Sequence, residues 1–234
     1  MAIEKKAPEL MNYSLFCGGC GHGVLLRLIC ECLEEYGLDK KTIAAIGVGC
    51  SCHLKSGISI DLIQSPHGRA AAVATGIRRA EPDKFVFTYQ GDGDAYNIGI
   101  AETLNAAYRN ENICVFTVNN GNFGMTGQKT ATSPSGRNCD LTGIPIKVPE
   151  LIAYSFTPAY VARGAVTTPA EINKLKGYIK NAFEAQLNNE GYSMVEIMCS
   201  CPTNWNLPPI AARQRLIDEV IPYYGLGEIK KRGV

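Results

Sequence analysis

The sequence lacks a strong net charge, a long apolar run and an apolar N-terminal leader. It has 23 Lys and Arg against 22 Asp and Glu, for a formal net charge of +1. Nothing in this balance predicts nucleic acid or an anionic membrane as a partner. No apolar stretch approaches the length of a membrane span, and residues 1–10 are charged where a secretory leader has an apolar core. We therefore expect a cytoplasmic protein.

Internal repeats, low-complexity stretches and long linkers are also missing, and 234 residues with 46% hydrophobic content fit one folded domain, 1–234. Apolar periodicity predicts helices and strands that alternate along the chain. The helices are expected at 23–36, 69–80, 97–108, 171–187 and 211–220, and the strands at 43–48, 85–89, 113–118, 159–162 and 192–198. This order predicts an α/β fold with a mostly parallel sheet and helices on both faces.

Glycine and polar residues follow three of the predicted strands, at 49–51, 91–94 and 119–122. In parallel sheets, ligands bind at the carboxyl ends of strands, beside a topological switch point. Asp92 and Asn120 follow neighbouring strands, so both side chains can face one crevice. With a backbone carbonyl they would form half of an octahedral magnesium shell, which a diphosphate and water would complete. The alternative is that both segments are ordinary turns.

The ten cysteines need an explanation other than disulfides, which are rare in a reducing cytosol. Cys17 and Cys20 form a Cys-x-x-Cys motif, Cys50 follows a strand, and Cys201 follows a later one. Four such thiolates could bind zinc or a 4Fe–4S cluster. Ordinary packing is expected for four others, which are Cys30, Cys32, Cys114 and Cys139.

Six motifs along the chain, at 16–23, 49–51, 66–70, 91–94, 124–128 and 201–203, occur in a recognisable order. Together they resemble the β subunit of the 2-oxoacid:ferredoxin oxidoreductases over nearly the whole chain. The segments 201–205 and 221–224 are similar to the branch that acts on 2-oxoisovalerate. One glycine fewer than is common in this family precedes Gln128, so the loop over the diphosphate is expected to differ slightly.

The resemblance implies a thiamine diphosphate-binding fold and a set of site residues. Magnesium would be held by Asp92, Asn120 and the backbone carbonyl of Asn122. A 4Fe–4S cluster would be held by Cys17, Cys20, Cys50 and Cys201. The cofactor would be lined by Val48, Gly49, Cys50, Ser51, His67, Gly68, Gly93, Asp94, Gly124 and Met125. The roles of His22, Cys52, His53 and Cys199 stay open, with Cys52 and Cys199 ranked below the four proposed cluster ligands.

The implied reaction is the CoA-dependent oxidative decarboxylation of a 2-oxoacid to acyl-CoA and CO2, with electrons passing through the cluster to ferredoxin. A branched-chain substrate such as 2-oxoisovalerate is expected, with 2-oxoglutarate or pyruvate as alternatives. A non-oxidative thiamine enzyme and a zinc-stabilised binding protein are further alternatives.

No catalytic residue is assigned within this chain. The glutamate that activates the aminopyrimidine ring is expected on a partner α subunit, so the chain alone should be inactive. We also expect γ and ferredoxin-like δ subunits as partners.

Overall fold

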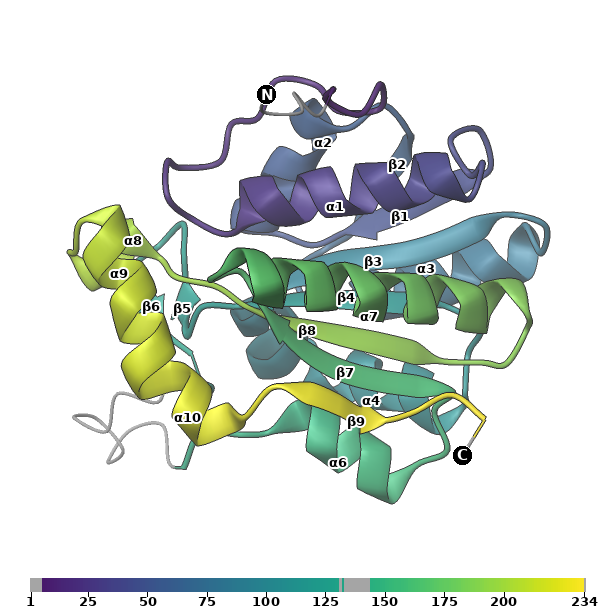
Figure 1. Cartoon of the computed structure of the whole chain (residues 1–234). Helices are drawn as coiled ribbons and strands as arrows, with labels where there is room; N and C mark the ends of the chain where they lie inside the picture. The colour runs from purple at the N-terminus through teal and green to yellow at the C-terminus, as the bar shows by residue number, and fades with distance from the viewer. Residues whose placement is uncertain (1–5, 131, 133–143, 234) are drawn as a thin grey trace.

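A seven-stranded sheet with the strand order β2-β1-β3-β4-β8-β7-β9 runs through the centre of the fold (Figure 1). The structure is a computed structural model that describes residues 6–130, 132 and 144–233, so Cys139 lies outside the described residues. The strands are β1 (Thr42–Ile46), β2 (Asp61–Gln64), β3 (Phe85–Gly91), β4 (Cys114–Asn119), β7 (Tyr160–Ala165), β8 (Ser193–Met198) and β9 (Gly227–Lys230). Neighbouring strands pair in parallel, except that β9 runs antiparallel to β7. The predicted mostly parallel sheet is therefore confirmed.

Helices cover both faces of the sheet, as predicted. One face carries α1 (His22–Glu35) and α7 (Pro169–Leu187), and the other carries α3 (Ala70–Ala80), α4 (Ile100–Tyr108) and α6 (Val148–Ser155) (Figure 1). Each face has its own apolar core, because residues of opposite parity along each strand point to opposite sides. The apolar stripe of α7, with Leu175, Ile179 and Phe183, is fully buried.

Shorter elements lie mainly at the carboxyl end of the sheet. They are η1 (Cys50–His53), α2 (Leu54–Gly57), η2 (Gly93–Ile98), β5 (Asn122–Phe123), β6 (Gln128–Lys129), α8 (Pro202–Trp205), α9 (Pro209–Arg215), η4 (Leu216–Val220) and α10 (Ile221–Tyr224). β5 and β6 form a small antiparallel hairpin.

The strand order creates a switch point between β1 and β3. The chain leaves β1 for β2 on one side and then returns to form β3 on the other side. The chain segments that follow β1 and β3 therefore run in opposite directions from the carboxyl ends of these strands, and a crevice opens between them. The segments that follow these two strands begin at Gly47 and Asp92.

Two predicted helices have clearly different bounds in the structure, and some elements were not predicted. The helix expected at 97–108 starts earlier, because Asp92 already has helical dihedrals and η2 leads through Gly99 into α4. The helix expected at 211–220 belongs to a longer helical run of α9, η4 and α10 over residues 209–224. The helix α6 and the edge strands β2 and β9 were not predicted, because each is short and the two strands have little burial periodicity.

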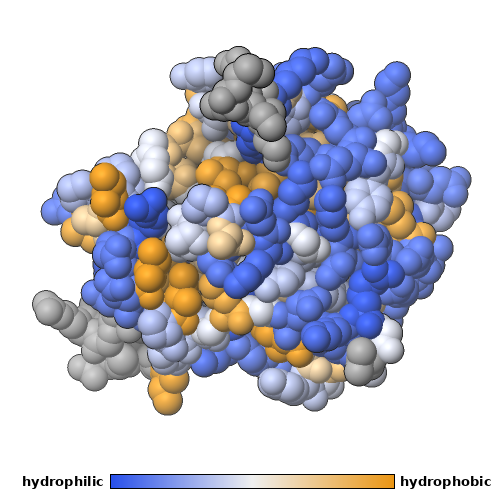
Figure 2. All heavy atoms as spheres, in the orientation of Figure 1, coloured by the Kyte–Doolittle hydropathy of each residue, from blue (hydrophilic) through white to orange (hydrophobic). Residues whose placement is uncertain are grey.

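The outer surface is uneven in polarity. In the orientation of Figure 1, hydrophilic side chains cover the right-hand side of the molecule, and hydrophobic ones gather on the left beside α8 and α9 (Figure 2). Within the described residues, none of the helices combines the length and the apolar character needed to span a bilayer.

Candidate functional site at the carboxyl end of the sheet

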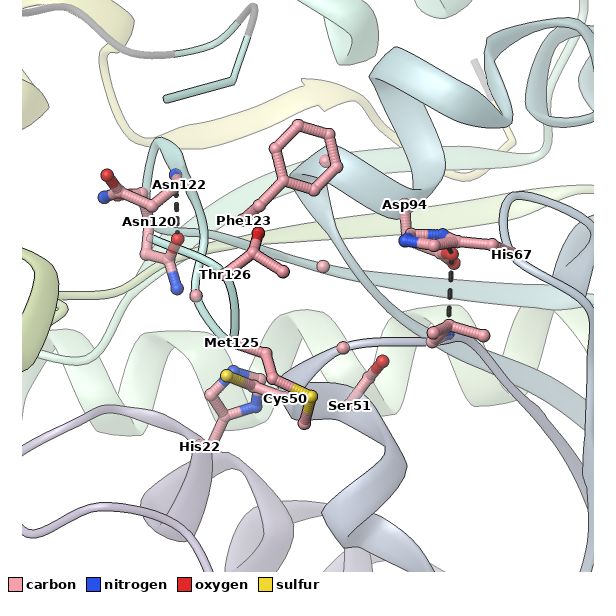
Figure 3. Close-up of a pocket in the computed structure, with 15 residues that line it drawn as sticks. His22, Cys50, Ser51, His67, Asp94, Asn120, Asn122, Phe123, Met125 and Thr126 are labelled. Carbon is pink, nitrogen blue, oxygen red and sulfur yellow. Dashed lines mark hydrogen bonds and ion pairs between the residues drawn. The ribbon is translucent and has the colours of Figure 1, made fainter. Parts of the chain in front are cut away.

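A cavity of about 170 Å³ opens at the switch point between β1 and β3. Figure 3 shows Asn120 and Asn122 on one side of it, and His67 and Asp94 on the other. Its lining residues come from five segments of the chain and are His22, Val48, Gly49, Cys50, Ser51, His67, Gly91, Gly93, Asp94, Asn120, Asn122, Phe123, Gly124, Met125 and Thr126. The topology thus brings the three glycine-rich strand ends together around one space.

The hydroxyl of Ser51 is the least satisfied polar group in this lining. Its residue is 1% exposed, and Oγ has no hydrogen-bond partner among the described residues. A buried hydroxyl without a partner costs free energy, so the position favours a bound group that supplies the missing hydrogen bond.

Asp94 joins the segments on either side of the cavity. Its Oδ1 accepts hydrogen bonds from the backbone N–H of Gly68 at 2.8 Å and from that of Val48 at 3.4 Å. The same oxygen meets Nδ1 of His67, and Gln90 donates from Nε2 to the other oxygen. Gly68, predicted as a lining residue, instead supports the wall through this amide.

Asp92 lies behind the cavity rather than in its lining. The carboxylate is fully buried and accepts hydrogen bonds from the hydroxyls of Thr130 and Thr132 and from the backbone N–H of Asn120. Burial raises the pKa of Asp92 to about 6, because the charged form loses its hydration. An opposite charge at this place would favour the carboxylate form.

The loop after β4 is bent by its own asparagines. Asn120 Oδ1 accepts the backbone N–H of Asn122 at 3.0 Å, and Asn122 Nδ2 donates to the backbone carbonyl of Asn120 at 2.7 Å. This loop leads into β5, so the Asn120-Gly121 pair precedes the β5–β6 hairpin instead of forming its turn. The oxygens that could hold a divalent cation here belong to Asp92, Asn120 and Asn122.

His22 begins α1 and takes part in a buried contact that the sequence did not indicate. Its Nδ1 lies 2.7 Å from the Tyr89 hydroxyl, and its ring stacks on Phe16 with centroids 4.6 Å apart. The structure shows no side-chain hydrogen bond that caps this helix start. Burial lowers the pKa of His22 to about 4, which leaves the imidazole neutral near pH 7.

The thiols of Cys17, Cys20, Cys50 and Cys201 lie close enough to interact electrostatically, and that of Cys50 lines the cavity. Burial, followed by electrostatic repulsion from the neighbouring thiols of Cys201, Cys17, Cys20 and Cys52, raises the pKa of the Cys50 thiol to about 11. Cys50 also lines the cavity, whereas Cys17 and Cys20 line an adjoining groove of about 460 Å³. Asn204 Nδ2 lies 3.4 Å from the Cys201 sulfur and donates to the Gly124 carbonyl at 2.7 Å, which links the thiol group to the cavity wall.

Other cysteines lie in or near the same region. Cys199 is buried beside Gly21, and Cys52 follows Cys50 in η1. The expected packing role is confirmed for three others, because Cys30, Cys32 and Cys114 are fully buried in the core under α1 and α7. In the parts of the chain that the structure describes, no three His, Cys, Asp or Glu side chains group in a way that could hold a metal ion.

Comparison with known proteins identifies the family to which the chain belongs. Residues 47–197 match the family described as thiamine pyrophosphate enzyme, C-terminal TPP binding domain. The chain is 37% identical over 228 residues to the ketoisovalerate oxidoreductase subunit VorA of Methanothermobacter thermautotrophicus, a match that covers 93% of this chain and 48% of that protein. It is 32% identical over 215 residues to the 2-oxoglutarate synthase subunit KorB of the same organism, covering 86% of this chain and 72% of that subunit. The chain belongs to the β-type subunits of the 2-oxoacid:ferredoxin oxidoreductase family.

A solved structure agrees with this fold. The 2-oxoglutarate:ferredoxin oxidoreductase from Magnetococcus marinus, solved with 2-oxoglutarate, coenzyme A and succinyl-CoA bound, superposes with a TM-score of 0.75 at 24% identity. The match covers 99% of this chain and 87% of that one. The predicted thiamine diphosphate-binding fold is thereby confirmed. The chain spans about half the length of VorA, 48%.

Most residues that line the cavity could be predicted from the motifs of this chain, and several of their neighbours could not. The cavity contains the predicted residues from Val48 to Ser51, together with His67, Gly93, Asp94, Asn120, Asn122, Gly124 and Met125. The motifs did not predict Phe123 and Thr126, which line the cavity. They also did not predict Thr130 and Thr132, which lie beside Asp92. The two threonines follow the loop motif by a few residues, and only the hairpin brings them back to the strand ends.

Proposed function

We propose that this chain is the thiamine diphosphate-binding subunit of a CoA-dependent 2-oxoacid:ferredoxin oxidoreductase, and that it acts as one domain. The observation that carries the proposal is the position of Cys50. This residue lines the cavity and also belongs to the thiol group formed with Cys17, Cys20 and Cys201. A cofactor in the cavity and a cluster on the thiols would then be close neighbours, as electron transfer between them requires.

The diphosphate would lie in the cavity with Mg²⁺ held by Asp92, Asn120 and the backbone carbonyl of Asn122. The unpartnered hydroxyl of Ser51 supports a bound acceptor at the base of the cavity. Val48, Gly49, His67, Gly68, Gly93, Asp94, Gly124 and Met125 would complete the site. Bound thiamine diphosphate supplies the electron sink for decarboxylation. The chain's part is to fix the diphosphate end and to hold the loop after β4 against it.

A 4Fe–4S cluster would take one thiolate each from Cys17, Cys20, Cys50 and Cys201. Such thiolates bind different iron atoms, so they stand farther apart than the ligands of a single ion. The four thiols of this chain fit such an arrangement, because they interact electrostatically although no compact site for a single metal ion is found among the described residues. Desolvation raises the pKa values of Cys20 and Cys50, and bound iron would offset this by stabilising their thiolates.

The reaction would convert a 2-oxoacid and CoA to acyl-CoA and CO2, with electrons leaving through the cluster to ferredoxin. VorA, at 37% identity, favours a branched-chain substrate such as 2-oxoisovalerate. The names of other relatives favour 2-oxoglutarate as the alternative. The partner α subunit would supply the glutamate for the aminopyrimidine ring, and γ and ferredoxin-like δ subunits would complete the enzyme.

Strictly anaerobic co-purification of the chain with its partners tests this proposal. We expect a brown complex that contains iron and thiamine diphosphate and reduces a viologen dye when given a 2-oxoacid and CoA. A panel of 2-oxoisovalerate, 2-oxoglutarate and pyruvate identifies the substrate. The chain purified alone is expected to be inactive. A colourless, iron-free complex that decarboxylates 2-oxoacids without dye reduction would instead favour a non-oxidative thiamine enzyme.

A further inference from the structure

A row of buried polar side chains crosses the sheet near the carboxyl ends of four neighbouring strands. The register aligns Gln90 of β3 with Thr117 of β4, Thr117 with Glu196 of β8, and Glu196 with Arg163 of β7. All four residues are at most 1% exposed. An ion pair buried inside a sheet has a large desolvation penalty, and apolar residues of similar volume often stabilise a fold equally well. The row therefore calls for a role beyond stability.

Arg163 holds the Glu196 carboxylate from one side. Its Nε forms an ion pair with Glu196 Oε2. Its two terminal nitrogens donate to the carboxylate of Glu150 at 2.6 Å each, and one also donates to the backbone carbonyl of Tyr224 at 2.8 Å. These contacts fix the guanidinium group, which in turn holds Oε2 of Glu196 and leaves Oε1 for another donor.

That second oxygen of Glu196 faces the strand that leads to the proposed magnesium site. Asn119 Nδ2 donates to Glu196 Oε1 at 2.9 Å, which fixes the side-chain amide of Asn119. The other end of this amide, Oδ1, accepts the backbone N–H of Gly121 at 3.1 Å. Gly121 has a left-handed φ of 67°, so this contact holds the sharp bend that directly follows Asn120.

Asn119 also reaches the threonine that contacts Asp92. Its Oδ1 lies 3.1 Å from the Thr132 hydroxyl, and that hydroxyl also hydrogen-bonds to the Asp92 carboxylate. The Tyr224 hydroxyl donates to the backbone carbonyl of Thr132. A continuous buried path thus runs from Arg163 through Glu196 and Asn119 to both Asp92 and the Asn120 loop.

We propose that the Arg163–Glu196 ion pair is a positioning device for the magnesium site, acting through Asn119. This inference rests on the proposed function, because it concerns the site formed by Asp92, Asn120 and Asn122. Groups that orient metal ligands affect metal affinity by about tenfold to a hundredfold without touching the metal. Arg163 and Glu196 are then positioning residues, and a variant of either that still folds should bind magnesium more weakly.

The test measures the Mg²⁺ concentration that half-saturates thiamine diphosphate binding, in the complex that co-purifies with the chain. Glu196→Leu removes the acceptor for Asn119 and should raise this concentration by about tenfold or more. Glu196→Gln keeps an acceptor oxygen and should restore most of the affinity, although it loses the ion pair. Lys176→Met, which breaks the remote contacts with Glu31 and Glu35, is the matched control and should leave the concentration unchanged.

Asn119→Ala keeps the Arg163–Glu196 ion pair but removes the residue through which it acts. This variant tests the inference if Glu196→Leu does not fold. It should also raise the half-saturating Mg²⁺ concentration by about tenfold. A folded Glu196→Leu or Asn119→Ala variant with the unaltered Mg²⁺ requirement would overturn the inference. If the unaltered complex binds no thiamine diphosphate in a magnesium-dependent way, the proposed function itself fails, and the two failures are thereby distinguished.

Discussion

Cys50 and Gly124 face each other so closely that a Cβ built on Gly124 would lie 2.7 Å from the Cys50 sulfur. Gly124 follows the short strand β5, and Cys50 begins η1 after β1. The two residues therefore mark the point where the loop over the cavity meets the proposed cluster ligands. A side chain at position 124 has no room unless the thiol moves.

We expect Gly124→Ala to lower the iron content of the complex severalfold, because the added methyl group pushes the Cys50 sulfur out of place. A ligating sulfur is fixed by its iron atom, so it cannot turn aside as a free thiol would. Iron per chain after anaerobic purification is the measurement, and far-UV circular dichroism checks that the fold is kept.

Gly76→Ala is the matched control for this substitution. Gly76 lies inside α3, and a Cβ there would meet nothing within 4 Å. Iron content should stay the same, and the free energy of unfolding should rise by about 0.5–1 kcal/mol, since alanine favours helix over glycine. Equal iron content in both variants would show that Cys50 needs no fixed position.

The choice of cluster ligands is tested by a cysteine series. Cys50→Ala and Cys201→Ala should each lose iron, whereas Cys52→Ala and Cys199→Ala should keep it. The series is informative because Cys50 and Cys52 are near neighbours in sequence, as are Cys199 and Cys201, so general damage to either segment would affect both of its cysteines. Iron content and the visible absorption of the cluster are the measurements, and loss of iron from Cys199→Ala with retention in Cys201→Ala would reverse the assignment.

The arrangement of strand ends could be predicted from the sequence because it depends on topology alone. Apolar strands followed by Asp92 and Asn120 place both residues at the same edge of a parallel sheet. Their adjacency follows from the pairing of β3 with β4, which consecutive β-α-β units favour. Glycines and cysteines near these ends then indicated the cavity and the thiol group.

Contacts that depend on register and on side-chain direction could not be predicted. Arg163 and Glu196 stand in strands whose alignment the sequence does not specify, so their ion pair was missed. Thr132 lies 40 residues after Asp92 and reaches it only because the β5–β6 hairpin folds back. The antiparallel strand β9 was missed because four partly exposed residues carry no clear alternation.

The side chain of Gln186 is expected to contribute to the stability of the fold at a place far from the cavity. Its side chain accepts from the backbone N–H of Val86 and donates to the Val86 carbonyl, both at 2.6 Å. Pairing of β3 with β4 begins at Phe87, so Gln186 replaces the missing strand partner of Val86. Gln186→Leu should lower the free energy of unfolding by about 2–4 kcal/mol, because two buried backbone groups lose their partners.

Chemical denaturation of the chain measures this effect. Gln214→Leu removes a glutamine from the exposed contact with Asp218 and serves as the control, with an expected change within about 0.5 kcal/mol. Similar values for the two variants would mean that water or a backbone shift replaces the Gln186 hydrogen bonds.

A substitution of Asp92 is expected to abolish ligand binding without lowering the stability of the ligand-free protein. The carboxylate is fully buried, and burial raises its pKa to about 6 because the charge loses hydration. Asp92→Asn removes that charge but keeps an oxygen for the hydroxyls of Thr130 and Thr132. In the absence of ligand, the variant should therefore be at least as stable as the unaltered chain at pH 8, where the carboxylate is ionised.

Magnesium-dependent binding of thiamine diphosphate should nevertheless be lost in Asp92→Asn, because a neutral amide is a much poorer ligand for Mg²⁺ than a carboxylate. Calorimetric titration with and without Mg²⁺ measures binding, and thermal unfolding of the ligand-free protein measures stability. Asp218→Asn, the same change on an exposed helical segment, should alter neither quantity. Retained magnesium-dependent binding in Asp92→Asn would exclude Asp92 as a ligand. A large loss of stability would mean instead that its hydrogen bonds with the two threonines outweigh the cost of burying its charge.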